Sequence, residues 1–490
     1  MRQYVLGIDI GSGSIKLTLL GDDGKIGAVA GCEYPTVYPK VGWAEQDPED
    51  WCRAFQKAFA QMAGETKIRP EQIVAVFPDA ATHTAVLLDE EKQVMGNAIH
   101  WTDQRSEEEV GLLNRDHLED ILEITLNQPT AIWTLPQLMW TRTHRPESWS
   151  RARYLLFAKD YLRYRLTGEL GTDGIDAMGS MFYDAGKQEW SEPLCHLAGV
   201  DLNWLPTVRR PDETAGYVTA EAAKEFGLAE GTRVLTGTTD TVMEMVSAGN
   251  VAPGHATVKL ATAGRICVVA DRPVKSPYIL NYRHVVPGLW YPGTATSSCA
   301  ASFRWFRDSI GRESFDDLCE KAKEIPPGSE GLLFHPYLQG ELTPYNDPSL
   351  RASYVGISSR HTTTHFTRAT LEGIAFSLKD CMDVITGLGM DMTRLRIIGG
   401  GAKSGLWRQI VADVLGMSLE KTEVDDSSFG SAIMAAVGAG WYRDLEEAAA
   451  ACVKVKSVTQ PDPDHHRLYE KQFLYYKMIQ QALEEVYHDG

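Results

Sequence analysis

A pattern of two strands joined by a turn of small residues occurs twice in the chain and limits the folds that it can adopt. At the start, Tyr4-Val5-Leu6-Gly7-Ile8-Asp9-Ile10 predicts a buried strand, a Gly/Ser turn follows, and residues 15–20 predict a second strand. At about residue 255 the pattern returns in HATVKLATAGRICVVA. We therefore expect two halves of related topology, each offering a hairpin turn that could approach a phosphate.

A third strand follows the first two directly and excludes a simple Rossmann start. GDDG at 21–24 is a turn signal, and a strand-like stretch begins at Ile26. In a Rossmann fold a helix should follow the first strand, whereas this start predicts three antiparallel strands. The later pattern predicts a helix over 48–63, strands over 72–78 and 85–89, mostly helices over 107–166, and a short strand with a turn over 231–240.

The length predicts two domains, because 490 residues exceed what one ordinary core holds. We place the boundary near residues 246–254, with an N-terminal domain over 1–248 and a C-terminal domain over 249–490. The fold class is α/β.

The charge and the apolar pattern exclude several classes of partner. The formal net charge is -18, from 66 acidic and 48 basic residues, which disfavours nucleic acid and anionic lipid. A phosphate substrate would then be held locally, by backbone amides and a metal. No apolar run reaches the roughly 20 residues of a membrane span, and the eight cysteines show no metal-ligand spacing. We expect a soluble cytoplasmic protein.

Asp9 and the turn after it form the first candidate site. The turn is Gly11-Ser12-Gly13-Ser14, and Lys16 follows in the next strand. An acid at a strand end can hold magnesium through water, while amides of the turn face phosphate oxygens. The alternative is a plain hairpin with a capping Asp.

Asp240 is the second candidate, within Thr236-Gly237-Thr238-Thr239-Asp240-Thr241. A carboxylate after a turn of small residues can reach a substrate hydroxyl, and phosphoryl transfer requires such a base. The alternative is that Asp240 is the N-cap of the following helix, since Glu244 lies close to the capping-box spacing.

The third candidate is Gly399-Gly400-Gly401-Ala402-Lys403-Ser404, between a strand over 395–398 and a helix from Leu406. Three glycines let the backbone approach a flat or charged ligand at a helix N-terminus. The segment is neither a Walker A loop nor GxGxxG. A tight strand-to-helix connection is the alternative, and we favour a nucleotide contact.

The fourth candidate is His100-Trp101-Thr102-Asp103-Gln104-Arg105. Its acid and guanidinium can each make two directed hydrogen bonds to a polyol, and a surface loop with a local ion pair is the alternative. His83 is a further candidate to face a sugar, although a single histidine is commonly a structural residue.

Together these segments resemble the FGGY family of carbohydrate kinases, and within it the xylulokinases. The resemblance covers essentially the whole chain, through GIDIGSGSIK, HWTDQR, AKDYLRYRLTG, TGTTD, YLQGELTPYNDPSLRASYVG, HFTRATLEGIAF and GGGAKSGLWRQIVADVLG. It implies two actin-like (ribonuclease H-like) domains with an active-site cleft between them. It further implies transfer of phosphate from ATP to a small sugar or polyol, with Mg²⁺ as cofactor.

The resemblance also assigns roles to residues. Asp240 would be the catalytic base, and Asp9, together with Asp240, would organise magnesium. Residues expected to contact ATP are Gly11, Ser12, Ser14, Lys16, Thr262, Gly400, Gly401 and Ala402. Residues expected to line the sugar side are His83, Trp101, Asp103 and Arg105.

The sequence departs from the xylulokinase pattern mainly on the sugar side. Residues 80–84 read AATHT instead of GQMHG, Thr102 replaces an Asn, and Thr241 replaces the Asn that commonly follows the base. LATAG replaces LGTSG, and Gln137 stands at the position of a Lys. Changed polar partners alter selectivity strongly, so D-xylulose is the leading substrate, and another ketopentose, a tetritol or another polyol is the alternative.

Two functions of other classes compete with the kinase. A non-catalytic sugar or nucleotide sensor would fit the altered sugar loop but does not explain why both Asp9 and Asp240 are present. A chaperone-type or filament-forming ATPase would leave HWTDQR without a role. The sequence leaves the oligomeric state open, and a homodimer is the commonest soluble assembly.

Overall fold

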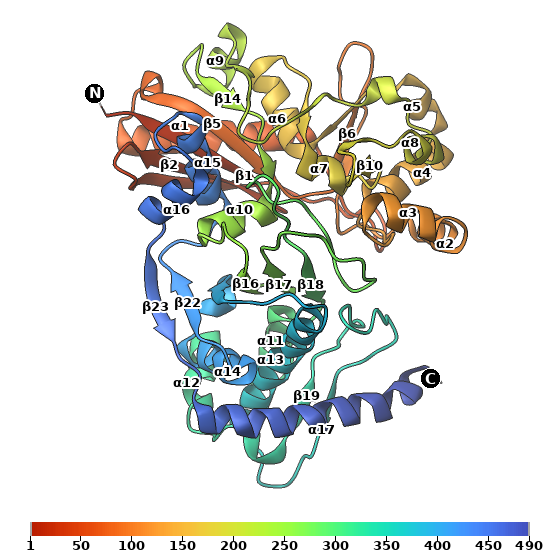
Figure 1. Ribbon diagram of the computed structural model, residues 1–490, viewed down its shortest axis with the longest axis vertical. Helices are drawn as coiled ribbons and strands as arrows, with labels where there is room; N and C mark the ends of the chain where they lie inside the picture. The colour runs from red at the N-terminus through yellow and green to blue at the C-terminus, as the bar shows by residue number, and fades with distance from the viewer. Residues whose placement is uncertain (1, 489–490) are drawn as a thin grey trace. The chain divides into compact units, whose positions relative to one another are not determined.

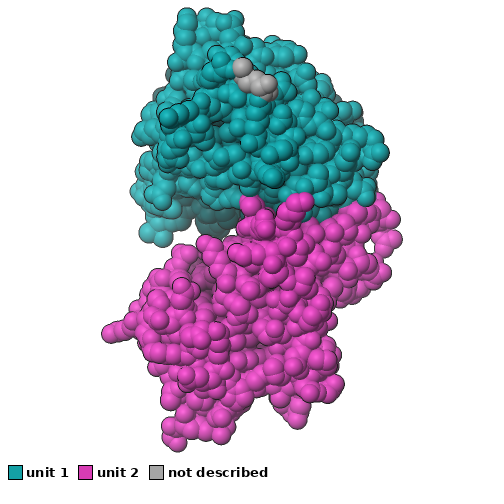
Figure 2. Space-filling view, turned by 90° about the vertical axis from the view of Figure 1, so that its left-hand side faces the viewer, with its two compact units in different colours: residues 1–251, 282–289, 426–453 teal, residues 252–281, 290–425, 454–490 magenta. Residues whose placement is uncertain are grey.

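A computed structural model describes residues 2–488 and divides into two compact units. Unit 1 comprises Met1–Val251, Tyr282–Leu289 and Asp426–Val453, and unit 2 comprises Ala252–Asn281, Trp290–Asp425 and Lys454–Gly490 (Figure 2). The first segment of unit 1 ends at Val251. Two segments from the second half of the chain also belong to unit 1, so the units do not correspond to a single division of the chain.

Unit 1 is built on a mixed sheet whose centre is β1. Across the sheet the strands are β13 (Thr214–Tyr217), β14 (Arg233–Leu235), β5 (Ile73–Ala80), β1 (Tyr4–Ile10), β2 (Ser14–Gly21) and β3 (Ile26–Glu33), and β15 (Thr238–Thr239) also pairs with β5. The first three strands of the chain run antiparallel, as the sequence predicts. β5 runs parallel to β1, β14 runs parallel to β5, and β13 is antiparallel to β14.

Unit 2 repeats this arrangement strand for strand. Its order is β18 (Gly293–Thr296), β17 (Gly264–Val268), β16 (His255–Leu260), β21 (Arg394–Ile398), β22 (Leu419–Thr422) and β23 (Val455–Thr459). β16, β17 and β18 are antiparallel, β16 and β22 both run parallel to β21, and β23 is antiparallel to β22. The predicted relation between the two hairpins is therefore confirmed and extends to six strands of each sheet (Figure 1).

Short two-stranded ladders complete the β-structure. They pair β4 (Glu45–Gln46) with β7 (Ala98–Ile99), β6 (Ala85–Leu88) with β8 (Tyr154–Phe157), β9 (Thr172–Asp173) with β12 (Val208–Arg209), β10 (Tyr183–Asp184) with β11 (Glu189–Trp190), and β19 (Leu333–His335) with β20 (Ser353–Val355).

The described part of unit 1 contains twelve α-helices, and several of them pack on its sheet. They are α1 (Pro48–Thr66), α2 (Glu107–Asp116), α3 (Leu118–Thr125), α4 (Thr134–His144), α5 (Pro146–Arg151), α6 (Ala158–Thr167), α7 (Gly174–Gly179), α8 (Glu192–Ala198), α9 (Ala220–Phe226), α10 (Asp240–Ser247), α15 (Ser427–Gly438) and α16 (Leu445–Cys452). α1 begins at the predicted Pro48, because Asp47 caps it and acids occupy its first turn. It packs on β2 and β3, while α15 packs on β1, β2 and β5.

Gly7 lets α15 approach β1 closely. A Cβ atom at this position would lie 2.0 Å from the Ser428 carbonyl oxygen and 2.3 Å from the Ala432 amide nitrogen. Only glycine leaves room for such backbone-to-backbone packing in a buried strand. The contact brings the N-terminal turn of α15 onto the face of the sheet that carries Asp9.

The helices of unit 2 surround a second core. They are α11 (Ala300–Phe306), α12 (Phe315–Ala322), α13 (Thr363–Gly387), α14 (Gly405–Leu415) and α17 (Pro463–His488). The long α13 buries Ile374, Phe376 and Leu378 against residues of β16, β17 and β21. A separate cluster forms the core of unit 1. Among the helices of residues 2–488, none is long and apolar enough to cross a membrane.

Parallel strands end at one edge of each sheet, and the predicted site residues follow those ends. In unit 1, the turn at 11–13 follows β1, Asp79 stands near the end of β5, and Asp240 follows β15. In unit 2, the turns at 261–263 and 399–404 follow the parallel strands β16 and β21. Ligands of open α/β sheets bind at this edge.

Candidate active site

Asp9 and Asp79 are paired directly across the parallel strands β1 and β5. Both side chains are buried, and the Oδ1 atom of each has no hydrogen-bond partner within residues 2–488. Ser431 of α15 donates a hydrogen bond of 2.5 Å to Oδ2 of Asp79. Two adjacent buried carboxyls with unused oxygens are a high-energy arrangement unless a proton or a cation joins them.

The environment of this pair favours its protonated form in the unliganded protein. The pKa of Asp9 is raised to about 7, chiefly by burial and then by the negative charges of Asp426 and Asp240, against a hydrogen bond from Ser427 and the charge of Lys16. Burial is the main reason that the pKa of Asp79 is held well above its usual range, and the charge of Asp9 is the second. A bound cation would replace the proton and favour both charged forms.

Asp240 is the first residue of α10, and the N-cap of that helix is Thr239. The interpretation of Asp240 as the N-cap is therefore wrong. Its carboxylate is half-buried, and Oδ1 accepts hydrogen bonds from the Thr241 amide at 2.6 Å and the Thr241 hydroxyl at 3.3 Å. Its charge contributes to the raised pKa of Asp9 and of Asp79, so the three acids form one electrostatic group.

A buried ionic network braces the segment that carries Asp240. Arg163 donates to the Thr236 carbonyl at 2.8 Å, and Asp173 accepts from the Thr238 hydroxyl at 2.9 Å. Lys159, fully buried, pairs with Asp173 at 3.1 Å and with Asp176 at 2.9 Å. Both contacts to the 236–239 segment come from side chains that cannot move without breaking buried ion pairs, so Asp240 stands on a rigid support.

The turn after β1 is held at several points. The Gly11 amide donates to the Ser14 carbonyl at 3.0 Å, which closes the turn. Gln46 donates to the Ser12 carbonyl at 2.8 Å, and the indole of Trp101 donates to the Ser12 hydroxyl at 3.0 Å. The structure thus joins two predicted residues, Ser12 and Trp101, from separate motifs.

Lys16 faces Asp9 in the register of β1 and β2, and its ammonium group donates to Oδ2 of Asp426 at 2.6 Å. Although burial lowers the pKa of Lys16, the charges of Asp426 and Asp9 raise it above the ordinary value. Asp426 also caps α15 by accepting from the Ser428 amide. Lys16 therefore links the acidic group to the N-terminus of α15.

His83 lies in an aromatic pocket of unit 1, with a left-handed backbone (φ 74°). Its Nδ1 atom is 2.8 Å from the Gly179 carbonyl, and its Nε2 atom is 3.1 Å from the Tyr282 hydroxyl. The ring of Trp133 meets the imidazole edge-on, with centroids 4.7 Å apart. A strained backbone with both ring nitrogens engaged fixes the imidazole in one orientation.

Asp103 and Arg105 form a buried ion pair that also includes Glu45. Arg105 donates to both Asp103 oxygens, at 2.9 and 2.7 Å, and to Glu45 at 2.8 Å. Its guanidinium lies 3.8 Å from the ring centre of Trp43. These groups are engaged within the protein, whereas the neighbouring Trp101 is half-buried.

The two predicted nucleotide turns lie side by side in unit 2. Thr262 is exposed in the β16–β17 turn, and its carbonyl accepts from the Ala301 amide at 3.1 Å. In the other turn Gly400 is exposed and Ala402 is buried. A Cβ atom on Gly399 would lie 2.7 Å from the Leu260 carbonyl oxygen, so glycine is required where this turn passes the end of β16.

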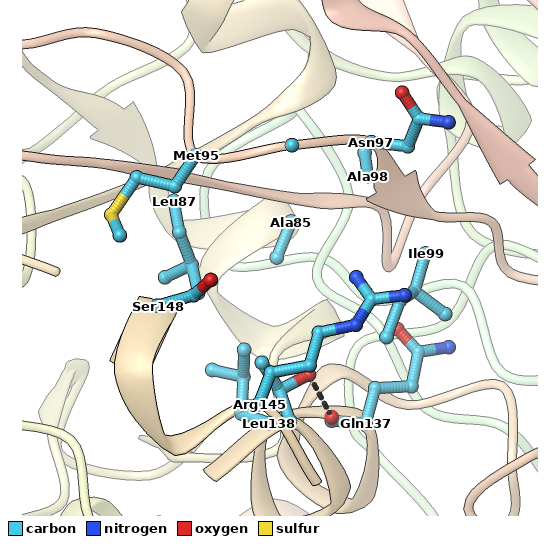
Figure 3. Close-up of a pocket in the computed structure, with 12 residues that line it drawn as sticks. Ala85, Leu87, Met95, Asn97, Ala98, Ile99, Gln137, Leu138, Arg145 and Ser148 are labelled. Carbon is cyan, nitrogen blue, oxygen red and sulfur yellow. Dashed lines mark hydrogen bonds between the residues drawn. The ribbon is translucent and has the colours of Figure 1, made fainter. Parts of the chain in front are cut away.

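A small hollow in unit 1 is separate from these residues. It is lined by Ala85, Leu87, Met95, Gly96, Asn97, Ala98, Ile99, Gln137, Leu138, Thr141, Arg145 and Ser148. Figure 3 shows Arg145, Leu138 and Gln137 on one side of it and Met95, Asn97 and Ala98 on the other. Its volume of about 40 Å³ admits about one water molecule and no sugar.

Three residues of the site were missed by sequence reasoning. Asp79 had a signal, because it is an acid directly after the predicted apolar strand over 72–78. Tyr282 and Asp426 had none, because they are 199 and 410 residues away from the His83 and Lys16 side chains that they contact.

Comparison with known proteins defines the class. Residues 4–247 match the N-terminal domain of the FGGY family of carbohydrate kinases, and residues 234–439 match its C-terminal domain. The xylulose kinase of Bacillus subtilis is 31% identical, with 97% of this chain and 96% of that protein aligned. The L-xylulose/3-keto-L-gulonate kinase of Escherichia coli is 30% identical over 99% of this chain and 98% of its own.

A solved structure agrees with the sequence matches. The ligand-bound xylulose kinase of Lactobacillus acidophilus superposes with a TM-score of 0.93 at 25% identity, covering 99% of both chains. The fold and the site define a two-domain sugar kinase of the actin-like class. The chain belongs to the FGGY family of carbohydrate kinases and is an enzyme similar to xylulose kinases. A kinase of this family uses ATP and acts on a small sugar substrate.

Proposed function

We propose that the enzyme transfers the γ-phosphate of ATP to a hydroxyl of a small ketose or polyol, with D-xylulose and its 5-phosphate as the leading substrate and product. The observation that carries the proposal is the place of Asp240, half-buried at the start of α10 beside the buried pair Asp9 and Asp79. Similarity to xylulose kinases favours this sugar.

Asp240 acts as the general base. Its carboxylate accepts the proton of the substrate hydroxyl as that oxygen forms a bond to the γ-phosphorus. The bond between the γ-phosphorus and the bridging oxygen breaks, and ADP leaves with the electron pair. The Arg163 and Asp173 contacts to residues 236–239 hold the base in place during this step.

The acidic group fits a magnesium ion. Its oxygens are hard ligands, and the buried Oδ1 atoms of Asp9 and Asp79 lack partners within the described chain. Asp9 would hold the ion with Asp240, and Asp79 would support Asp9. When bound, the ion neutralises charge on the β- and γ-phosphates.

The nucleotide contacts follow the turns at the sheet edges. Backbone amides of Gly11, Ser12 and Ser14 would face phosphate oxygens, near Lys16. In unit 2, Thr262 would contact phosphate, and Gly400, Gly401 and Ala402 would contact the adenosine through their backbone. Exposure of Gly400 supports this role, since nothing in the described chain lies within 4 Å of its missing side chain.

The sugar contacts come from His83 and Trp101. Arg105 forms ion pairs with both Asp103 and Glu45, so these side chains are engaged within the protein. We infer that Asp103 and Arg105 position the loop that carries Trp101. Thr102 is also engaged, with its hydroxyl 2.8 Å from His100 Nδ1. With Ala81 in place of a Gln, the site lacks one polar group that could recognise a sugar hydroxyl, so another ketopentose or polyol stays a second candidate.

A coupled ADP-release screen tests the proposal. The panel holds D- and L-xylulose, D- and L-ribulose, tetritols, pentitols, glycerol and a sugar acid, with ATP and magnesium. One substrate with a much higher kcat/KM than the rest supports the proposal and names the sugar. Activity confined to sugar acids would overturn the ketose and polyol assignment but keep the kinase.

A further inference from the structure

Three side chains that can bind a metal ion converge at the end of α17, in unit 2 (Figure 1). Glu484 and His488 belong to the helix, and Asp347 lies in the segment between β19 and β20. Each side chain offers one ligand atom, and these three atoms all lie within 4.8 Å of one another. An imidazole and two carboxylates from distant parts of the chain thus face one point.

The helix fixes the relative position of two of these ligands. Glu484 and His488 are four residues apart, so they are neighbours on one face of α17. Tyr487 packs on the core of unit 2, which holds the last turn of the helix in place. Earlier in α17, the Lys477 ammonium group donates a hydrogen bond of 2.9 Å to the Tyr345 hydroxyl. The helix is therefore tied to the segment that carries the third ligand.

The carboxylate of Asp347 is oriented before any ion binds. The backbones of Asp347 and Glu341 exchange two hydrogen bonds of 2.9 Å. Oδ1 of Asp347 accepts from the Ser349 amide at 2.8 Å, and Oδ2 lies 2.7 Å from Nε2 of His488. Ligating carboxylates in metal sites are commonly held by such an outer hydrogen bond. One oxygen is thus held by the protein, and the other faces the imidazole.

The charges around this group favour a cation. His488 is the partner of Asp347, but Glu484, although partly buried, has no hydrogen bond or ion pair with any residue between 2 and 488. Glu484 also lies one turn before the end of α17, where the negative end of the helix macrodipole disfavours a carboxylate. A divalent ion would neutralise both carboxylates at once.

The ligand types indicate which metal fits. Carboxylates alone suit magnesium or calcium, whereas an imidazole suits zinc and other transition metals. Zinc accepts histidine nitrogen and carboxylate oxygen, and its ligand atoms in a tetrahedral site lie about 3.3 Å apart at bond lengths of about 2.0 Å. Binding would therefore require the three atoms to close in by about 1 Å at most places in the shell. Water can fill the fourth position.

We propose that Asp347, Glu484 and His488 bind one zinc ion, which joins the end of α17 to the segment between β19 and β20. The neutral imidazole binds through Nε2, so any proton between His488 and Asp347 is released on binding. All three ligands belong to unit 2. The inference depends neither on the sugar that the enzyme phosphorylates nor on magnesium at Asp9.

Isothermal titration calorimetry with zinc chloride tests the site. The full chain is first treated with a chelator and then dialysed into a buffer that contains magnesium. Wild type should bind zinc at this site with a Kd in the micromolar range, and its melting temperature should rise by a few degrees. His488→Ala, Asp347→Asn and Glu484→Gln should each weaken binding at least about tenfold, because loss of even an outer partner of a ligand costs about 10- to 100-fold.

The same helix supplies a matched control. Glu470 lies four residues from His466, with 3.7 Å between the charged atoms, and within residues 2–488 no third metal-binding side chain joins them. Glu470→Gln should leave zinc affinity unchanged, and Asp9→Asn in unit 1 should retain this zinc ion. Unchanged melting temperatures without zinc verify that the variants are folded. No binding by wild type at about 100 µM zinc, or binding that the three ligand substitutions leave intact, would overturn the proposal.

Discussion

Asp9 and Asp79 stand opposite each other in adjacent parallel strands, each buried and each with an oxygen that no described residue satisfies. A sheet normally avoids like charges in directly opposite positions. Their presence beside Asp240 indicates that the unliganded protein holds a proton at the place where we propose that magnesium binds.

The pH dependence of stability follows from this pair. Both carboxyls have raised pKa values, about 7 for Asp9, so the metal-free folded state holds more protons than the unfolded state above about pH 4. The contribution of this pair to stability is therefore full below that pH and falls as pH rises to about 7, by about 1.4 kcal/mol per pH unit for each proton of difference.

Chemical denaturation at several pH values, in the presence of a chelator, measures this slope. Asp79→Asn should flatten it, because a buried acid whose pKa is held well above its usual range is then gone. Asp391→Asn changes an exposed acid and should leave the slope as in wild type. A wild-type profile without a slope, or one that Asp79→Asn does not alter, would count against the shared proton.

Magnesium should stabilise the protein through Asp9. We expect the melting temperature of wild type with ADP to rise on adding magnesium, and the rise to be larger at high pH, where fewer protons compete. Asp9→Asn should lose most of this rise. If Asp9→Asn responds to magnesium as wild type does, the ion binds elsewhere.

Gly179 controls the place of His83. A Cβ atom there would lie 2.4 Å from the Thr82 side chain and 3.5 Å from His83 Nδ1. Gly179→Ala should displace this loop and raise KM for the sugar roughly 10- to 100-fold, with KM for ATP unchanged. Gly64→Ala, in α1 with open space around it, is the matched control. Equal increases in KM for the sugar and in KM for ATP would contradict the assignment of His83 to the sugar site.

Substitutions at the neighbouring glycines Gly400 and Gly401 distinguish a nucleotide contact from a packing role. At Gly400 an added Cβ meets nothing within 4 Å, whereas at Gly401 it would lie 2.6 Å from the Trp407 ring. Gly400→Ala should raise KM for ATP about tenfold with little change in melting temperature. Gly401→Ala should destabilise the fold by about 1–3 kcal/mol. An unaltered KM for ATP in Gly400→Ala would contradict the adenosine contact.

The local parts of the fold were predictable, and the long-range parts were not. Both hairpins, and the strand-to-helix turn at Gly399, follow from short segments whose residues suffice to specify them. The return of α15 to unit 1, by contrast, depends on Gly7 accepting a helix more than 400 residues later in the chain. No periodicity in either segment encodes that contact.

In the candidate site, too, residues in short local motifs were predictable from the sequence, and residues placed by long-range contacts were not. Asp9 was predicted because it stands at the end of a strand that a turn of small residues follows, and Asp240 because it comes directly after such a turn. Arg105 was expected to face a polyol, and its burial depends on Glu45, 60 residues earlier. Ion pairs of this kind arise from tertiary packing, so residue type and spacing do not distinguish them from ligand contacts.

A single-turnover experiment with γ-labelled ATP tests the role of Asp240 most directly. The enzyme is in excess over ATP, and the acceptor is the sugar that the screen identifies. Wild type should form the labelled sugar phosphate, and Asp240→Asn should slow this step about 10²- to 10⁴-fold while still binding nucleotide. Asp271→Asn, an exposed acid of unit 2, is the control. Transfer by Asp240→Asn at a rate close to wild type would contradict the assignment of the base.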